Sequence, residues 1–142
     1  MRTFEVQGIE IHVPFDRTFT YVSEPRNLPE WTEAFRRVYD GRALMETPGG
    51  AVEISLVVES SREHGTIDWL MGFPDGSTAR ACSRLVKTRE DRSLYTFILM
   101  TPPVALEQIE GALDRQSLIL REELERLKRV LEGHRPGDSP SR

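Results

Sequence analysis

The first thirteen residues alternate between hydrophobic and polar side chains. The apolar positions are Phe4, Val6, Ile9, Ile11 and Val13, and their parity changes across Gly8. A two-residue period is typical of a strand with one buried face, and a parity change at a glycine predicts a β-bulge. Residues 3–13 are therefore expected to form a bulged strand that ends at Pro14.

The next segment, FTYVSEPRNLPEWTEAF at residues 19–35, has a helical spacing that is interrupted by two prolines. Asp16 is suited to cap a short helix that Pro25 terminates, and Asn27 is suited to cap a second helix with Pro29 in its first turn. We therefore expect two short helices, the second of which carries Trp31.

Five more apolar runs follow, each bounded by turn residues such as TPGGA, SREHG, FPDGS and TREDRS. They predict strands at residues 38–47, 51–60, 65–73, 77–87 and 93–101. Because the connections are short, consecutive strands are expected to be antiparallel neighbours.

The period changes to seven residues between Val104 and Glu132. The apolar stripe of this segment consists of Leu106, Ile109, Leu113, Leu120, Leu124, Leu127 and Leu131. The run REELERLKR supplies a solvated face, so the pattern predicts one amphipathic helix about 40 Å long. Residues 133–142 are rich in proline, glycine and serine and are expected to form a flexible tail.

These elements predict a single α+β domain over residues 1–132. A curved six-stranded antiparallel sheet would grip the long C-terminal helix, with the two short helices between strands 1 and 2, because only this helix is large enough to cover one face of the sheet. The space under the helix near the short helices would be a pocket of ligand size.

The chain resembles a known superfamily in three places: the segment EIHVPFDRTFTYVSEPRNLPEWTEAF, the strands including GTIDWLMGFPDGSTARACSRLVK, and the closing helix. This is the polyketide cyclase/dehydrase and lipid-transport superfamily, also called START-like, SRPBCC or helix-grip. The resemblance covers Thr3 to Glu132 and is sharpest around Pro29 and Trp31. It implies a hydrophobic cavity between sheet and C-terminal helix. Members include cyclases, lipid and quinone carriers, hormone receptors and chaperone cofactors, so the fold does not by itself define the function.

The composition of the chain limits the kinds of binding partner that we expect. The chain has 142 residues, a net charge of −4 and one cysteine, Cys82. A negative chain has no general attraction to phosphate backbones, so we expect no nucleic-acid partner. A single cysteine excludes an intrachain disulfide framework, and no apolar run is long enough to span a bilayer, so we expect a cytoplasmic protein without a membrane span.

The hairpin around FPDGS determines which side chains face the predicted cavity. A three-residue loop, Pro74-Asp75-Gly76, would pair Trp69 with Ala81 and put large aromatic residues opposite small alanines on one face. A two-residue Asp75-Gly76 loop would instead put Arg80 and Arg84 on that face, which would suit a carboxylate or phosphate ligand. The amphipathic pattern favours the first register and an apolar ligand.

We interpret the following residues as candidates for ligand binding: Trp31, Tyr39, Trp69, Met71, Phe73, Ala81, Phe97 and Ile109. For Trp69, packing in the core is an equally good interpretation. Trp31 would either plug the mouth of the cavity, on a helix weakened by prolines, or fasten the short helices to the sheet.

No catalytic motif, phosphate loop or dinucleotide-binding pattern is present, and the three histidines lack metal-ligand spacing, so neither a metal nor a cofactor is expected. Tyr39, Tyr95 and Asp68 would serve proton transfer only if they point inward. Asp68 beside Arg80 and Arg84 is more simply an ion pair on the wet face.

The leading hypothesis is a protein that binds an apolar or amphipathic small molecule under its C-terminal helix. The alternative is an enzyme of cyclase, aromatase or dehydratase type that uses the same cavity, with Tyr39 or Tyr95 assisting proton transfer. A second alternative is a protein-interaction module, and a homodimer through the sheet edge is possible.

Overall fold

The structure is a computed structural model that describes residues 3–47, 50–100 and 106–133, without the side chains of Thr47 and of residues 106–113. The elements in chain order are β1 (Phe4–Ile11), α1 (Phe15–Val22), the 3₁₀ turn η1 (Pro25–Asn27), α2 (Leu28–Trp31), β2 (Phe35–Tyr39), β3 (Arg42–Thr47), β4 (Gly50–Ser61), β5 (Thr66–Gly72), β6 (Thr78–Arg89), β7 (Arg92–Met100) and α3 (Leu106–Gly133).

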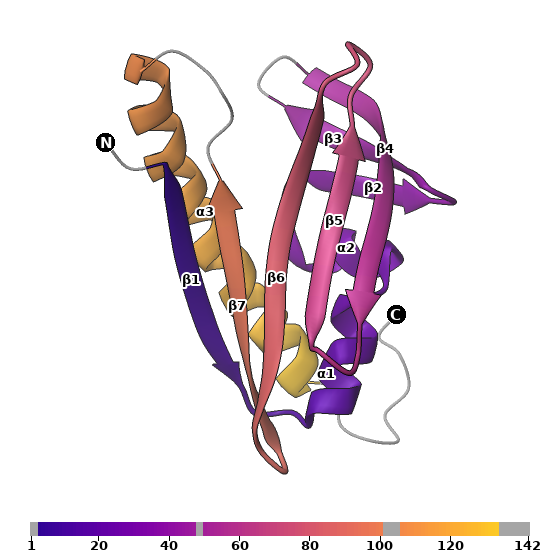
Figure 1. The fold of residues 1–142 in the computed structure, drawn as a ribbon, viewed down its shortest axis with the longest axis vertical. Coiled ribbons are helices and arrows are strands. Elements are labelled where there is room, and N and C mark those ends of the chain that lie inside the picture. The colour runs from indigo at the N-terminus through magenta and orange to yellow at the C-terminus, as the bar shows by residue number, and fades with distance from the viewer. Residues whose placement is uncertain (1–2, 48–49, 101–105, 134–142) are drawn as a thin grey trace.

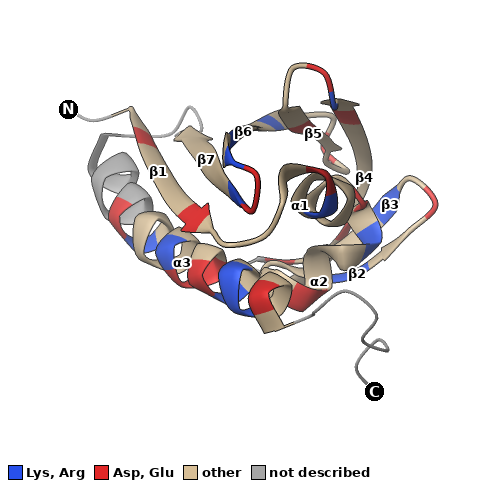
Figure 2. Cartoon of the chain, turned by 90° about the horizontal axis from the view of Figure 1, so that it is seen from below, with Lys and Arg blue, Asp and Glu red and all other residues tan. Residues whose placement is uncertain are grey.

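The seven strands form one antiparallel sheet in the order β1-β7-β6-β5-β4-β3-β2. Strands β2 to β7 follow one another as a meander, and β1 lies beside β7 (Figure 1). Figure 2 shows that the sheet is strongly curved and that α3 runs from beside β1 towards α2. The predicted α+β architecture with a sheet around a long C-terminal helix is therefore confirmed.

The sheet has seven strands, whereas the sequence pattern predicts six. The predicted strand at residues 38–47 is interrupted by Asp40 and Gly41, which connect β2 to β3 so that Tyr39 pairs with Arg42. Gly41 has a φ of 75°, a conformation that glycine adopts without steric cost. A two-residue Asp-Gly loop is a strong hairpin signal, and it splits the segment into two short strands.

The predicted bulge at Gly8 is wrong. β1 pairs with β7 without a register shift, from Phe4 with Met100 to Ile11 with Ser93. Phe4 and Val6 consequently lie on the outer face of the sheet, 56% and 54% exposed. The parity change reflects two apolar residues on the outer face, not an extra residue in the strand.

The short helices form where expected, but their caps differ from the prediction. Pro14, not Asp16, occupies the N-cap of α1, whereas Asn27 occupies the N-cap of α2 as predicted, although its side chain makes no capping bond. Asp16 instead accepts a hydrogen bond from Arg62, in the β4–β5 connection, at 3.1 Å. Arg62 also lies over the ring of Phe19, 4.8 Å from its centroid, and so fastens α1 to the sheet.

The core lies between the concave face of the sheet and the helices. The buried apolar side chains of α3 are Leu120, Leu124, Leu127 and Leu131. They confirm the C-terminal half of the predicted apolar stripe, because positions spaced by three and four residues share one helix face. The N-terminal half of that stripe lies outside the described side chains.

Candidate functional site

The β5–β6 hairpin has the three-residue loop that the sequence favours. Trp69 pairs with Ala81, and the amide of Phe73 donates to the carbonyl oxygen of Ser77 at 2.9 Å. Gly76 closes the turn with a φ of 90°. Since side chains alternate along a strand, Trp69 and Met71 of β5 and the alanines of β6 face the concave side, whereas Arg80 and Arg84 of β6 face outward.

The exposure of the inward side chains changes along strands β5, β6 and β7. Towards the hairpin tip, the inward side chains are half-buried or exposed, namely Met71, Phe73, Ser77, Ala79, Ala81, Phe97 and Leu99. Further along the same strands, the inward side chains are buried, namely Ile67, Trp69, Ser83, Leu85, Ser93 and Tyr95. The concave face therefore has a filled end next to α1 and an open end next to the hairpin tip.

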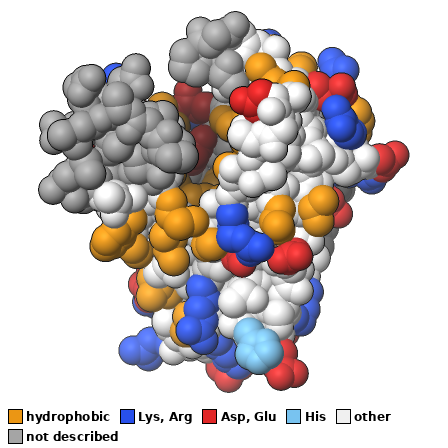
Figure 3. Space-filling model, turned by 45° about the horizontal axis from the view of Figure 1, so that its top comes forward, with side chains coloured by type: hydrophobic (Ala, Val, Ile, Leu, Met, Phe, Trp, Pro, Cys, Tyr) orange, Lys and Arg blue, Asp and Glu red, His pale blue; other side chains and the backbone are white. Residues whose placement is uncertain are grey.

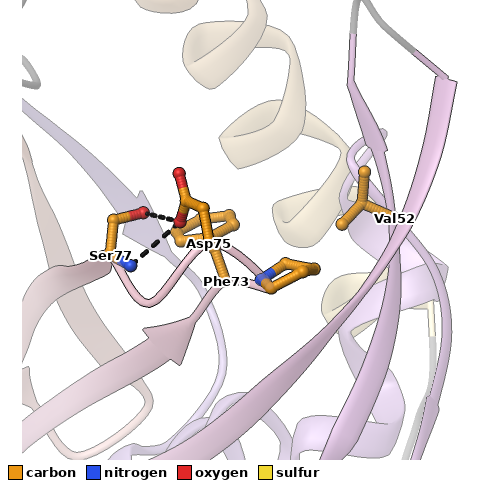
Figure 4. Close-up of a pocket in the computed structure, with 5 residues that line it drawn as sticks. Val52, Phe73, Asp75 and Ser77 are labelled. Carbon is orange, nitrogen blue, oxygen red and sulfur yellow. Dashed lines mark hydrogen bonds between the residues drawn. The ribbon is translucent and has the colours of Figure 1, made fainter.

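A pocket of about 410 Å³ lies at this open end. It is lined by Val52 of β4 and by Phe73, Pro74, Asp75 and Ser77 of the hairpin (Figure 4). Asp75 accepts hydrogen bonds from the amide and the hydroxyl of Ser77, at 2.9 and 2.6 Å, and these bonds lower its pKa. The carboxylate thus stabilises the turn at the pocket's rim.

The floor of the open end is aromatic. The ring of Trp69 stacks on that of Phe97, with centroids 5.9 Å apart, and Trp31 of α2 meets Tyr95 edge to face at 6.4 Å. The side chains of Trp31, Trp69 and Tyr95 are each at most 3% exposed. Trp31 therefore covers the floor from the side of the short helices.

Three polar atoms of this floor have no hydrogen-bond partner among the described residues: Nε1 of Trp31, Nε1 of Trp69 and the hydroxyl of Tyr95. The hydroxyl of Ser83 lies near Tyr95 but donates to the carbonyl oxygen of Ile67 at 2.6 Å. Burial raises the pKa of Tyr95, which keeps the phenol protonated. Leaving a buried donor without a hydrogen-bond partner costs about 1–3 kcal/mol.

A polar cluster joins β1 to α3 on the other flank of the concave face. The side-chain amide of Gln7 donates to the carbonyl oxygen of Ser117 at 2.7 Å, and the Ser117 hydroxyl donates to Glu5 at 2.8 Å. Glu5 and Gln7 occupy the inward positions of β1, since Phe4 and Val6 face outward. The concave face thus has one polar flank beside its apolar strands.

A second contact joins α3 to the end of α2. Glu123 accepts a hydrogen bond from the backbone amide of Glu33 at 2.7 Å. Burial is the main cause that raises the pKa of Glu123 to about 7; the charges of Glu33 and Glu122 act in the same direction, and the hydrogen bond from Glu33 and the charge of Arg126 oppose it. This carboxyl group therefore changes its charge near neutral pH.

The outer face of the sheet has a different character. Arg80 pairs with Asp68 at 3.0 Å, as the sequence predicts for the wet face. Figure 3 shows apolar side chains clustered on this side of the molecule, next to basic ones. The cross-strand pairs Phe4–Met100 and Val6–Ile98, all at least 38% exposed, form an apolar patch there.

Five of the predicted site residues lie together on the concave face: Trp69, Met71, Phe73, Ala81 and Phe97. Trp31 contacts Tyr95, which follows Phe97 on the inward face of β7. Tyr39 does not join them, because it is 38% exposed and its hydroxyl bonds to Glu53. The side chain of Ile109 lies outside the described residues.

Sequence reasoning did not single out the polar residues Glu5, Gln7, Ser117 and Glu123, which join α3 to β1 and to the end of α2. The inward position of Glu5 and Gln7 follows from the uninterrupted register of β1, which the predicted bulge obscured. Glu123 belongs to the run that reads as a solvated helix face, and only the packing of α2 against α3 places it partly inside.

The described residues do not form a metal site or a membrane span. No three described His, Cys, Asp or Glu side chains gather as a metal ion would require. In the part of the chain that the structure describes, no helix combines the length and apolar character needed to cross a bilayer.

Sequence comparisons found no matching family model, and no curated protein matched. Solved structures, in contrast, are similar over nearly the whole chain. A START superfamily protein from Mycobacterium smegmatis has a TM-score of 0.68 at 13% identity, covering 93% of this chain and 99% of its own. The Zhui aromatase/cyclase from a Streptomyces species has a TM-score of 0.68 at 9% identity, covering 96% of this chain and 98% of its own.

The di-domain ARO/CYC BexL has a TM-score of 0.67 at 19% identity. The match covers 93% of this chain but 47% of BexL, so the chain corresponds to about half of that protein. At these identities the comparisons show a common fold. The chain thus has the fold of START superfamily and aromatase/cyclase proteins, as the resemblance in its sequence implies.

Proposed function

We propose that this START-fold chain binds an apolar or amphipathic small molecule on the concave face of its sheet, under α3, and that the molecule enters at the hairpin tip. The observation that carries the proposal is the change in exposure along β5, β6 and β7. A folded core normally buries its inward apolar residues, yet Met71, Phe73 and Phe97 remain partly exposed on a concave face.

The size and composition of the open end suit a small ligand. The hollow at the hairpin tip is open to solvent and has a volume of about 410 Å³. Small side chains at Ala79 and Ala81 leave room between the larger residues of β5 and β7. Glu5, Gln7 and Ser117 supply a polar flank, which supports an amphipathic ligand.

Two neighbouring substitutions on opposite faces of β6 test the proposal. Ala79→Phe would fill the open end, whereas Thr78→Phe would place the same ring on the outer face. Both residues are exposed, so neither change should lower the unfolding midpoint by more than a few degrees. An environment-sensitive apolar dye should bind the wild type and Thr78→Phe alike and Ala79→Phe at least tenfold more weakly. Equal binding to all three would refute the location.

The bound molecule can be identified from the purified protein. Native mass spectrometry followed by denaturing extraction would show a co-purified quinone, fatty acid or polyketide-like compound if the protein is a carrier.

A cyclase or aromatase activity is the second candidate. It is supported by the likeness to Zhui and BexL and by the protonated, buried hydroxyl of Tyr95. In such an enzyme the pocket would fold a reactive chain and a positioned phenol would assist proton transfer. Turnover of a polyketide-like substrate that is lost in Tyr95→Phe, with binding retained, would favour this activity over simple binding.

The cytoplasmic location and the homodimer stay predictions. The exposed apolar patch of Phe4, Val6, Ile98 and Met100 is the surface at which a protein partner would bind, if there is one. Sedimentation equilibrium of the wild type and of Val6→Lys would reveal a dimer that depends on this patch.

A further inference from the structure

The unpaired donors of the floor lie at the boundary between the open and the filled end. Trp69 is the first fully buried inward residue of β5, after Phe73 and Met71. Tyr95 is the first on β7, after Leu99 and Phe97. A molecule that enters at the hairpin tip and reaches the limit of the open end therefore meets these two side chains.

The two donors lie on the strands on either side of β6. Trp69 pairs with Ala81 and Tyr95 pairs with Leu85, so they stand on either side of Ser83, which lies between those partners on the same face. Ser83 uses its hydroxyl proton on the carbonyl oxygen of Ile67. The indole of Trp69 and the phenol of Tyr95 thus each have a proton to donate on the concave face, on either side of Ser83.

Water does not reach these donors in this arrangement. Their nitrogen and oxygen atoms are inaccessible, and Trp31 covers Tyr95 from the side of α2. α2 is a single turn with Pro29 in its first residues, and its own Trp31 nitrogen is also unpaired. For a ligand to reach the hydroxyl of Tyr95, this short helix has to move aside.

We propose that the ligand carries an oxygen acceptor, a ketone or ether oxygen within an otherwise apolar skeleton, that accepts hydrogen bonds from Trp69 and Tyr95. This inference rests on the proposed function and specifies it. A plain hydrocarbon would leave both donors unpaired, whereas an acceptor satisfies them. Trp69 and Tyr95 are then the residues that determine specificity at the floor of the site.

A matched pair of probes isolates this interaction. 2-Acetylnaphthalene and 2-ethylnaphthalene share a skeleton and differ in the ketone oxygen, and their dissociation constants can be measured by calorimetry for the wild type and for Tyr95→Phe. The ratio of the two constants should change by five- to tenfold in Tyr95→Phe, in the direction of weaker ketone binding. Tenfold corresponds to about 1.4 kcal/mol. Comparing ratios cancels the different hydrophobicity of the two probes.

A measurement of stability without ligand tests whether the Tyr95 hydroxyl has a partner in the folded protein. Tyr95→Phe removes a hydroxyl without a partner, so its urea midpoint should not be lower than that of the wild type. A lower midpoint would show that the hydroxyl is paired in the folded protein and would overturn the inference.

The outcomes separate the inference from the proposed function. If both probes bind and the ratio of their dissociation constants is unchanged in Tyr95→Phe and in Trp69→Phe, the ligand site stands, but the inference that the ligand carries an oxygen acceptor (the acceptor rule) is wrong. If neither probe binds to the wild type or competes with the apolar dye, the site itself is refuted, and the acceptor rule with it.

Discussion

Glu123→Gln should stabilise the protein above neutral pH and leave its stability unchanged in acid. Burial raises the pKa of the Glu123 carboxyl group from 4.5 to about 7 in the folded protein. Folding therefore takes up a proton between these pH values, so the stability that this group contributes decreases as the pH rises. Glutamine keeps an acceptor for the Glu33 amide and carries no charge, so it avoids this loss.

The size of the effect follows from the two pKa values. A difference of one pKa unit corresponds to 1.36 kcal/mol, so the change from 4.5 to about 7 gives about 3 kcal/mol at pH 8. Because the side chain keeps some exposure to solvent, this is the upper end of the expected gain.

Urea unfolding at several pH values between 4 and 8 measures the difference between variant and wild type. That difference should be near zero at pH 4 and rise towards about 3 kcal/mol at pH 8, and groups that both proteins share cancel. Glu125→Gln, on the exposed side of the same helix, should stay within about 0.5 kcal/mol at every pH. A Glu123→Gln protein no more stable than the wild type at pH 8 would refute the assigned burial.

Three further predictions concern the fold. Gly65→Ala should destabilise the fold by more than 2 kcal/mol, because Gly65 has a φ of 73° and the new Cβ would overlap the Leu85 carbonyl oxygen. Gly41→Ala, at a φ of 75° in open space, should cost only about 1–2 kcal/mol. Equal losses of stability in thermal melts of the two variants would contradict this. Leu127→Ala should cost about 2–5 kcal/mol and Leu118→Ala, 66% exposed, under about 0.5 kcal/mol in urea unfolding, and a small loss at Leu127 would argue against its place in the core. Deleting residues 104–142 should abolish soluble folding, since it uncovers the concave face; a soluble fragment with a cooperative transition would disprove the role of α3.

The sequence predicted those features that depend on local pattern. The hairpin at Pro74-Asp75-Gly76 combines a specific turn with an amphipathic alternation, and both indicate the register that pairs Trp69 with Ala81. The heptad leucines likewise indicate the buried face of α3. In each case neighbouring residues contain the whole signal.

The features that were missed depend on distant parts of the chain. Phe4 and Val6 look like a buried face, but the register with β7 turns them outward and places Glu5 and Gln7 inside. Glu123 is one acidic residue in a charged helix until α2 packs against it. The unpaired donor of Tyr95 becomes visible only when its neighbours Trp31 and Ser83 are in place, because an unsatisfied group is a property of its surroundings.

The pairing of β1 with β7 has a consequence for how the chain folds during synthesis. The meander from β2 to β7 can form strand by strand as each segment emerges from the ribosome. β1, in contrast, pairs with β7, so Phe4 has no partner until Met100 has been synthesised. At about 5–20 residues per second, the first strand stays without its partner for roughly 5–20 s. α3, which contacts β1, is made later still, so the contacts with the greatest sequence separation close last and are expected to limit the folding rate.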